Sequence, residues 1–158
     1  MEDTKKVCSC FGHREIQLTE KLYATTTAAI MRAIKQGCRV FFFGGFGEFD
    51  RLCYQIVTKL RQENPAWELQ RVFCVTSEYY LRKKYHYFKN EDYEDVIYLT
   101  PSFTGWYKAI YYRNCAMIDN SAVVIFYAEE RKDSGAYKAY KYAKKSKDKQ
   151  IVNLWNEP

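Results

Sequence analysis

The sequence predicts a single α/β domain of the doubly wound, Rossmann-like kind, with a mainly parallel sheet and helices on both of its faces. Short apolar runs alternate along the chain with longer segments in which apolar residues recur every three or four positions. The short runs are apolar throughout, which is typical of strands buried on both faces in a parallel sheet. A length of 158 residues suits one domain, so residues 1–158 are expected to form one unit.

The first half of the chain carries two complete strand-helix units and a further strand. The predicted order is strand 7–11, helix 18–36, strand 39–43, helix 48–64 and strand 70–76. Both helical segments show an apolar stripe at the spacing of one helix face. Gly37 is placed to end the first helix, and Pro65 ends the second.

The second half repeats the alternation after a long polar and aromatic connection. The predicted order is strand 96–99, helix 106–119, strand 122–127, helix 134–147 and strand 151–154. The crossovers between parallel strands are expected to be right-handed. No linker, repeat or low-complexity segment divides the chain.

Composition and cysteine spacing narrow the function classes. Hydrophobic residues make up 47% and charged residues 28%, which excludes a disordered or fibrous chain. The net charge of +6 favours anionic partners. The six cysteines form no C-x-x-C pair, so we expect buried free thiols and no metal or cofactor. The opening residues lack a signal-peptide stretch, which predicts a cytoplasmic protein with no membrane partner.

Two segments that follow predicted strands have the composition of anion sites. Gly12, His13 and Arg14 come after the first strand, and arginine offers a planar fork of donors that suits phosphate. Ser134 and Gly135 open the last helix after the fifth strand. In a parallel sheet both places lie at the edge where ligands bind. The alternatives are a turn glycine with solvated neighbours and a simple helix N-cap at Ser134.

The loop after the second strand is rich in glycine and leads directly into a helix. Gly44, Gly45, Phe46 and Gly47 are expected to present bare backbone amides to an anion at the helix N-terminus. Asp50 follows in the first helical turn, where it could complement the helix dipole or accept from ribose hydroxyls. A tight strand-to-helix turn is the alternative explanation of the loop.

An arginine lies on the apolar stripe of the helix at 106–119. Arg113 therefore needs a partner, since an unpaired charge is not left in a core. One interpretation is a structural salt bridge to an acid such as Asp50 or Asp119. The other is that Arg113 and Asn114 hold a phosphate or a sugar in the crevice.

Together these motifs resemble the SLOG superfamily, the Rossmann-like group that includes the "Lonely guy" enzymes, and most of all its YpsA-like branch. The matching pieces are Gly12-His13-Arg14, the loop at 44–50, Arg113-Asn114 with Met117 and Asp119, and Ser134-Gly135. The resemblance implies a nucleotide or nucleotide-derived, ADP-ribose-like ligand in the crevice, bound by a sensor or a sequestering module. It also implies self-association, because family members are commonly homodimers.

Two other functions stay open at this point. Some SLOG enzymes are phosphoribohydrolases that cleave the N-glycosidic bond of nucleoside monophosphates. Their G-G-x-G-T-x-x-E motif has Glu48 and Arg51 here in place of its Thr and Glu, so Asp50 would have to supply the catalytic carboxylate. The third function is single-stranded nucleic-acid binding, because tyrosines alternate with lysines and arginines at 78–98. Packing of these rings on the sheet edge, in a dimer interface or as a lid is the alternative.

Overall fold

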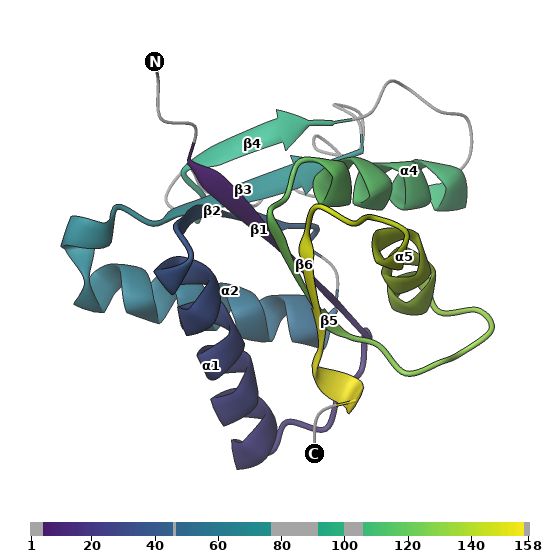
Figure 1. The fold of residues 1–158 in the computed structure, drawn as a ribbon, viewed down its shortest axis with the longest axis horizontal. Helices are drawn as coiled ribbons and strands as arrows, with labels where there is room; N and C mark the ends of the chain where they lie inside the picture. The colour runs from purple at the N-terminus through teal and green to yellow at the C-terminus, as the bar shows by residue number, and fades with distance from the viewer. Residues whose placement is uncertain (1–4, 46, 77–91, 100–105, 157–158) are drawn as a thin grey trace.

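The six described strands form one parallel sheet, as the sequence predicts. The computed structural model describes residues 5–45, 47–76, 92–99 and 106–156 (Figure 1). The strands lie in the order β4-β3-β2-β1-β5-β6, and every neighbouring pair is parallel. They are β1 (Lys6–Gly12), β2 (Cys38–Phe43), β3 (Gln70–Val75), β4 (Asp95–Tyr98), β5 (Val123–Tyr127) and β6 (Gln150–Asn153). The order reverses between β1 and β5, which is where an open α/β sheet leaves a crevice.

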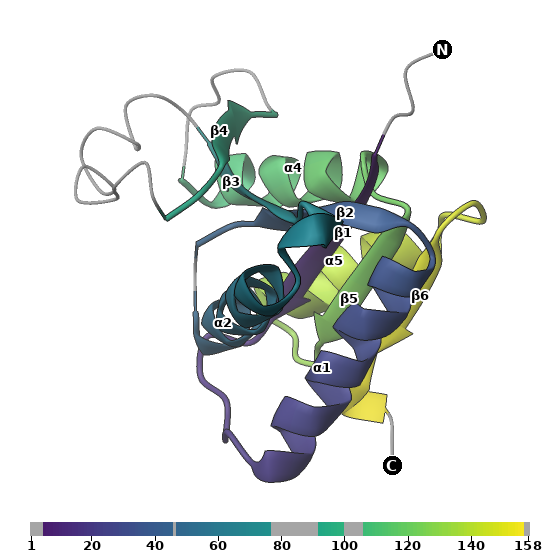
Figure 2. The same cartoon turned by 90° about the vertical axis from the view of Figure 1, so that its left-hand side faces the viewer.

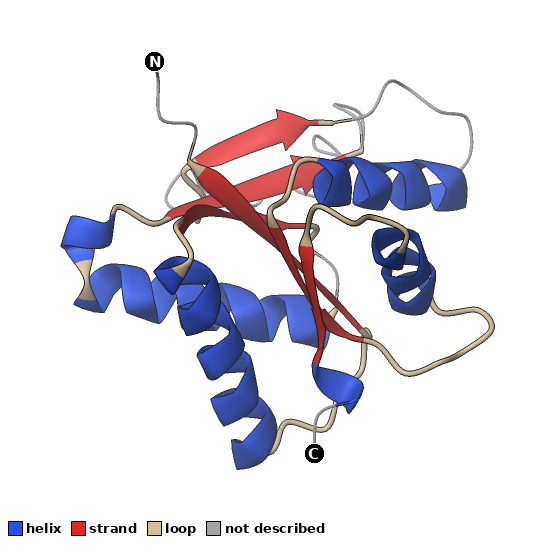
Figure 3. Cartoon of the chain, in the orientation of Figure 1, coloured by secondary structure: helices blue, strands red, loops and turns tan. Residues whose placement is uncertain are grey.

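The described helices cover both faces of the sheet (Figures 2 and 3). They are α1 (Glu20–Lys35), α2 (Glu48–Glu63), α4 (Trp106–Asp119) and α5 (Gly135–Lys144), with short 3-10 turns η1 (Pro65–Trp67) and η2 (Leu154–Asn156). Two hydrophobic cores result. One joins α1 and α2 to the sheet, and the other joins α4 and α5 to the opposite face. The doubly wound arrangement predicted from the alternation is therefore confirmed.

Helix boundaries differ from the predicted ones where a side chain caps the first turn. The first helix begins at Glu20 rather than 18, because the Thr19 hydroxyl accepts from the backbone N–H of Leu22 at 3.0 Å. The last helix begins at Gly135 because Ser134 is its N-cap, with extended dihedrals and a 3.0 Å hydrogen bond from Tyr137 N–H. That helix ends at Lys144, three residues before its predicted end at 147.

Three observations concern the cysteines, possible metal ligands and possible membrane-spanning helices. All six cysteines are buried free thiols. Among the residues that the structure describes, no three His, Cys, Asp or Glu side chains are grouped so that they could hold a metal ion. In the same residues no helix combines the length and apolarity needed to cross a bilayer.

Candidate functional site

A cleft of about 930 Å³ opens at the carboxyl ends of β1 and β5. It brings together residues that are far apart in the sequence and were predicted as site residues. These are Gly12, His13, Arg14, Gly44, Asp50, Arg113, Asn114, Ser134 and Gly135. Gly45 and Gly47 lie in the same loop but do not line the cleft, and Phe46 falls outside the described residues. The cleft opens at the edge of the sheet where the sequence analysis expects a ligand.

The amides of Gly44 and Gly45 are not bare, so this part of the prediction is wrong. Gly44 N–H donates to Asp50 Oδ1 at 3.3 Å, and Gly45 N–H donates to Asp50 Oδ2 at 3.1 Å. Asp50 is the third residue of α2, from which a carboxylate can fold back over the N-terminal amides. The chain thus supplies its own anion at the place expected for a ligand's phosphate.

The glycines of this loop are explained by neighbours within the chain. A Cβ at Gly44 would lie 2.6 Å from Arg113 Nη2, and one at Gly47 would lie 2.7 Å from Arg14 Cα. Gly47 also has a φ of +89°, a backbone conformation that L side chains rarely adopt. The close approach inferred from glycine content is real, but its partner is the protein itself.

Asp50 is a titratable group on the floor of the cleft. Only 8% of its surface is exposed, and this burial raises its pKa to about 7, with a further upward contribution from Cys10. The Gly44 amide, the Arg113 charge and the Gly45 amide act in the opposite direction. The carboxyl therefore changes charge near neutral pH.

Arg113 ties α4 to the ends of two strands. It is 4% exposed, and its Nη1 donates to the carbonyl oxygens of Gly44 at 3.0 Å and Cys74 at 3.4 Å. Its Nε and Nη2 donate to Asn114 Oδ1 at 3.3 and 2.9 Å. These contacts give Arg113 a structural role at the site, whether or not it also meets a ligand.

His13 holds the loop after β5 against the end of β1. Its Nε2 accepts a 2.7 Å hydrogen bond from Glu129 N–H, so the ring is unprotonated at that nitrogen. Nδ1 then carries the proton and faces Ser134 Oγ at 3.4 Å. Burial and, secondly, Arg131 lower the His13 pKa, which agrees with a neutral ring. Both ring nitrogens are thus engaged inside the wall of the cleft.

The rim of the cleft is basic and partly aromatic, a feature that the sequence reading missed. Five exposed cations line it: Arg14, Lys108, Arg131, Lys132 and Lys138. The acidic lining residues are Glu15, Asp50 and Asp133. Tyr111 and Tyr112 of α4, 37% and 46% exposed, belong to the same lining. The last helix contributes Lys138 to this rim, so part of its basic face lines the cleft.

Most of the tyrosine-rich segment falls outside the described residues. This applies to Tyr79, Tyr80, Tyr85, Tyr87, Phe88, Arg82, Lys83, Lys84 and Lys89. Of the two described rings, Tyr93 packs on Tyr54 and Phe73, with centroids 5.1 Å away in each case. Tyr98, on β4, is 47% exposed. The packing alternative therefore holds for Tyr93.

Comparison with known proteins gives structural neighbours only. No family model matches the chain, and no curated protein matches it. The fold is similar to DNA processing protein A (DprA) from Streptococcus pneumoniae, with a TM-score of 0.57 and 12% identity over 92% of this chain. It is also similar to DprA from Helicobacter pylori, with a TM-score of 0.63 and 16% identity over 94% of this chain; that structure concerns a single-stranded DNA binding mode.

The chain spans 49% and 65% of the length of these two neighbours. At such identities the likeness concerns the fold. It supports the Rossmann-like fold that the resemblance implies, and it tests neither the SLOG superfamily nor its YpsA-like branch. The chain thus has the Rossmann-like α/β fold that the DprA proteins share.

Proposed function

We propose that this protein binds single-stranded nucleic acid in the cleft at the carboxyl ends of β1 and β5. The observation that carries the proposal is the rim, where exposed cations from α4, the β5–α5 loop and α5 surround one opening beside Tyr111 and Tyr112. Phosphates of a single strand follow such a line of cations, while the bases stack on exposed rings. The shared fold with a protein whose structure concerns single-stranded DNA binding supports the same function.

The charge balance of the lining favours a polyanion. Lys108, Lys132 and Lys138 form no salt bridge with any described acid, and Arg131 is paired with Glu129 at 2.7 Å. Unpaired surface cations release counterions when phosphates replace them, and this release supplies most of the affinity for nucleic acid. Binding through about four such contacts weakens about 50-fold between 50 and 200 mM salt.

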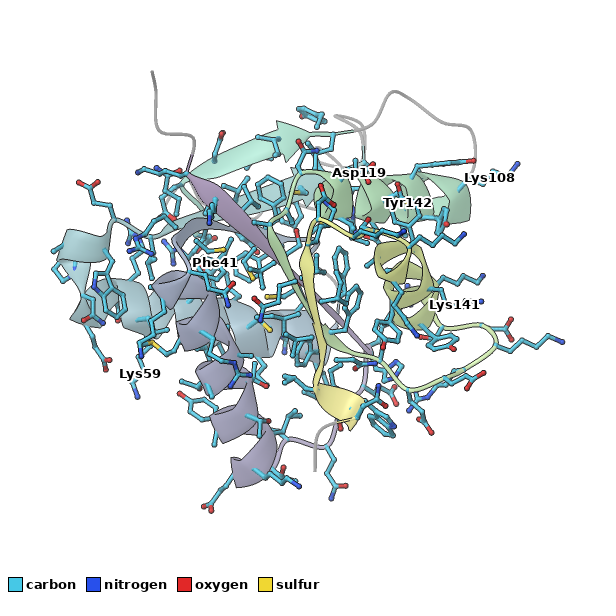
Figure 4. All side chains as sticks on the ribbon, viewed as in Figure 1. Phe41, Lys59, Lys108, Asp119, Lys141 and Tyr142 are labelled. Atoms are coloured by element: carbon cyan, nitrogen blue, oxygen red, sulfur yellow. The ribbon has the colours of Figure 1, made fainter. Side chains whose placement is uncertain are left out.

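Two double variants, each of which removes two lysine charges, test the proposal. The variant Lys108→Gln/Lys138→Gln loses two rim cations, whereas Lys35→Gln/Lys59→Gln loses two exposed lysines on the opposite face of the sheet, of which Figure 4 labels Lys59. Fluorescence anisotropy with an oligothymidylate, measured across a salt series, should show weaker binding and a salt slope smaller by about 1.4 for the rim variant. Equal slopes for the two variants would remove the cleft as the binding surface.

A free nucleotide or ADP-ribose-like molecule is the second candidate ligand. The cleft volume of about 930 Å³ lies within the range of small-molecule sites, and its floor contains the buried polar residues Asp50, Arg113 and Asn114. This ligand class follows from the resemblance to the YpsA-like branch. Thermal stabilisation by mononucleotides or ADP-ribose, with no affinity for oligonucleotides, would favour it over the first candidate.

The phosphoribohydrolase function depends on Asp50. Its buried carboxyl, with a pKa of about 7, could exchange a proton near neutral pH. Incubation with nucleoside monophosphates should then release free base, and Asp50→Asn should abolish the release. If no base appears with the unmodified protein, binding without turnover is the remaining function.

Native mass spectrometry of the same sample tests the homodimer that the resemblance implies.

A further inference from the structure

Asn114 presents two hydrogen-bond donors that the described chain does not use. Its Oδ1 accepts from Arg113 Nε and Nη2, and arginine can only donate, so the amide orientation is fixed. The Nδ2 group points the other way and makes no hydrogen bond with any described residue. Asn114 is 7% exposed and lines the cleft. A buried amide without an acceptor is costly, which indicates that a ligand or water completes it.

Ser134 likewise has its proton available for a ligand. Its Oγ accepts from Tyr137 N–H at 3.0 Å and faces the protonated Nδ1 of His13 at 3.4 Å. The His13 tautomer follows from the hydrogen bond that Glu129 N–H gives to Nε2. Both acceptor positions of the hydroxyl are therefore used, so its own hydrogen is directed elsewhere. Ser134 thus acts toward the cleft as a donor.

The first turn of α5 adds backbone donors next to this hydroxyl. The N–H groups of Gly135 and Ala136 have no acceptor among the described residues, and both residues line the cleft. A Cβ built at Gly135 would meet nothing within 4 Å. The helix N-terminus also carries a partial positive charge. Space, donors and charge at this point all suit an anion.

From these residues the geometry points to a binding site for a terminal phosphate, a phosphomonoester, at the N-terminus of α5 with Asn114. This inference rests on the proposed function where the phosphate ends a nucleic-acid strand; the same chemistry is offered by a free nucleotide. Every uncommitted polar group named above is a donor, which matches a phosphate and its acceptor oxygens. A monoester presents three such oxygens and a charge near −2, whereas an internal diester presents only two.

Burial favours a strand end over an internal phosphate. Asn114, Arg113 and Asp50 are 7%, 4% and 8% exposed, so the donor at Asn114 lies at the floor of the cleft. A group at the end of a strand can enter to that depth alone. An internal phosphate would have to bring nucleotides in on both sides. The rim cations would then hold the remaining strand outside, at the opening.

The experiment compares strand ends. Oligothymidylates with a phosphate or a hydroxyl at the 5′ end, and a second pair that differs at the 3′ end, are titrated by fluorescence anisotropy with the dye at the opposite end. We expect about a tenfold tighter complex for one phosphorylated end, the effect of one or two charge-assisted hydrogen bonds. Equal affinities within both pairs would overturn the terminal-phosphate site and leave the proposed function standing.

Two variants assign the preference to this site. Asn114→Asp keeps the oxygen that Arg113 needs but replaces the donors with an acceptor, and Asn120→Asp makes the same change at the exposed end of α4. Gly135→Leu fills the open space with a good helix former, so its melting temperature should not fall. The preference should vanish in Asn114→Asp and Gly135→Leu and persist in Asn120→Asp. Its survival in the first two overturns the assignment.

The failure of the proposed function is recognised separately. If no oligonucleotide binds, thermal shift with thymidine monophosphate and with thymidine decides the inference alone. Stabilisation by the monophosphate only, lost in Gly135→Leu, supports the phosphate site. The absence of stabilisation by either compound overturns it.

Discussion

Replacing Asp50 with asparagine should change how the stability of the protein depends on pH. The carboxyl is buried, and its pKa is raised from 3.8 to about 7, mainly by that burial. The folded protein therefore holds this proton more firmly than the unfolded chain. The stability contributed by protonated Asp50 is fully present below pH 3.8 and is lost as the pH rises through about 7.

The size of the effect follows from the shift. A displacement from 3.8 to about 7 corresponds to roughly 4 kcal/mol in all, and about 3 kcal/mol of it is lost between pH 5 and pH 8. Asparagine does not titrate, but its NH₂ group, a donor, replaces one of the two oxygens that accept hydrogen bonds from the Gly44 and Gly45 amides. One of these amides is left unpaired, at a cost of about 1–3 kcal/mol at any pH.

Urea denaturation of the wild type and Asp50→Asn near pH 5, 6.5 and 8 measures this directly. The free energy of unfolding of the wild type should exceed that of the variant most at the lowest pH. This difference should shrink by about 3 kcal/mol toward the highest pH. Asp133→Asn, an exposed acid of the same cleft, is the matched control and should show a constant difference. A constant difference for Asp50→Asn as well would refute the inference that Asp50 is protonated in the folded protein at low pH.

Substitutions at three further positions test the packing, the capping and an ion pair. Gly12→Ala places a Cβ against the fully buried side chain of Phe49, and the clash should lower the free energy of unfolding in urea by about 1–3 kcal/mol. Ser134→Ala should cost about 1 kcal/mol of thermal stability through the lost N-cap, and Ser134→Asp should restore it. Glu94→Gln weakens the pair with the buried Arg71 guanidinium at 2.7 Å, and the unfolding free energy should fall by about 2 kcal/mol. This is below the range for a fully buried pair because the side chain of Glu94 is 24% exposed.

Local features were predictable from the sequence. The apolar stripe of α2 and the cap at Ser134 depend on residues within a few positions of one another, and both are found where the pattern placed them. The alternation of strands and helices predicted a parallel sheet, so a ligand site was expected at the carboxyl ends of the strands, the edge at which the cleft opens.

Contacts that depend on the path of the chain in three dimensions were not predictable in the same way. The glycine loop was expected to be open because nothing in its sequence shows that Asp50 turns back onto its amides. The basic rim combines Arg14, Lys108 and Lys138, which lie on separate elements of the chain. Only the packing of α4 and α5 on one face of the sheet brings them to the same opening.

The hydrogen bonds that Asp50 accepts from its own chain have a consequence for the protein without a ligand. Since the amides of Gly44 and Gly45 already have acceptors, this corner of the sheet keeps its shape when no anion is bound. A ligand then enters a preformed cleft, and little of its binding free energy is spent on organising the backbone. Ligand association should therefore be fast and should move the backbone little. The fit of the ligand to the cleft should determine selectivity.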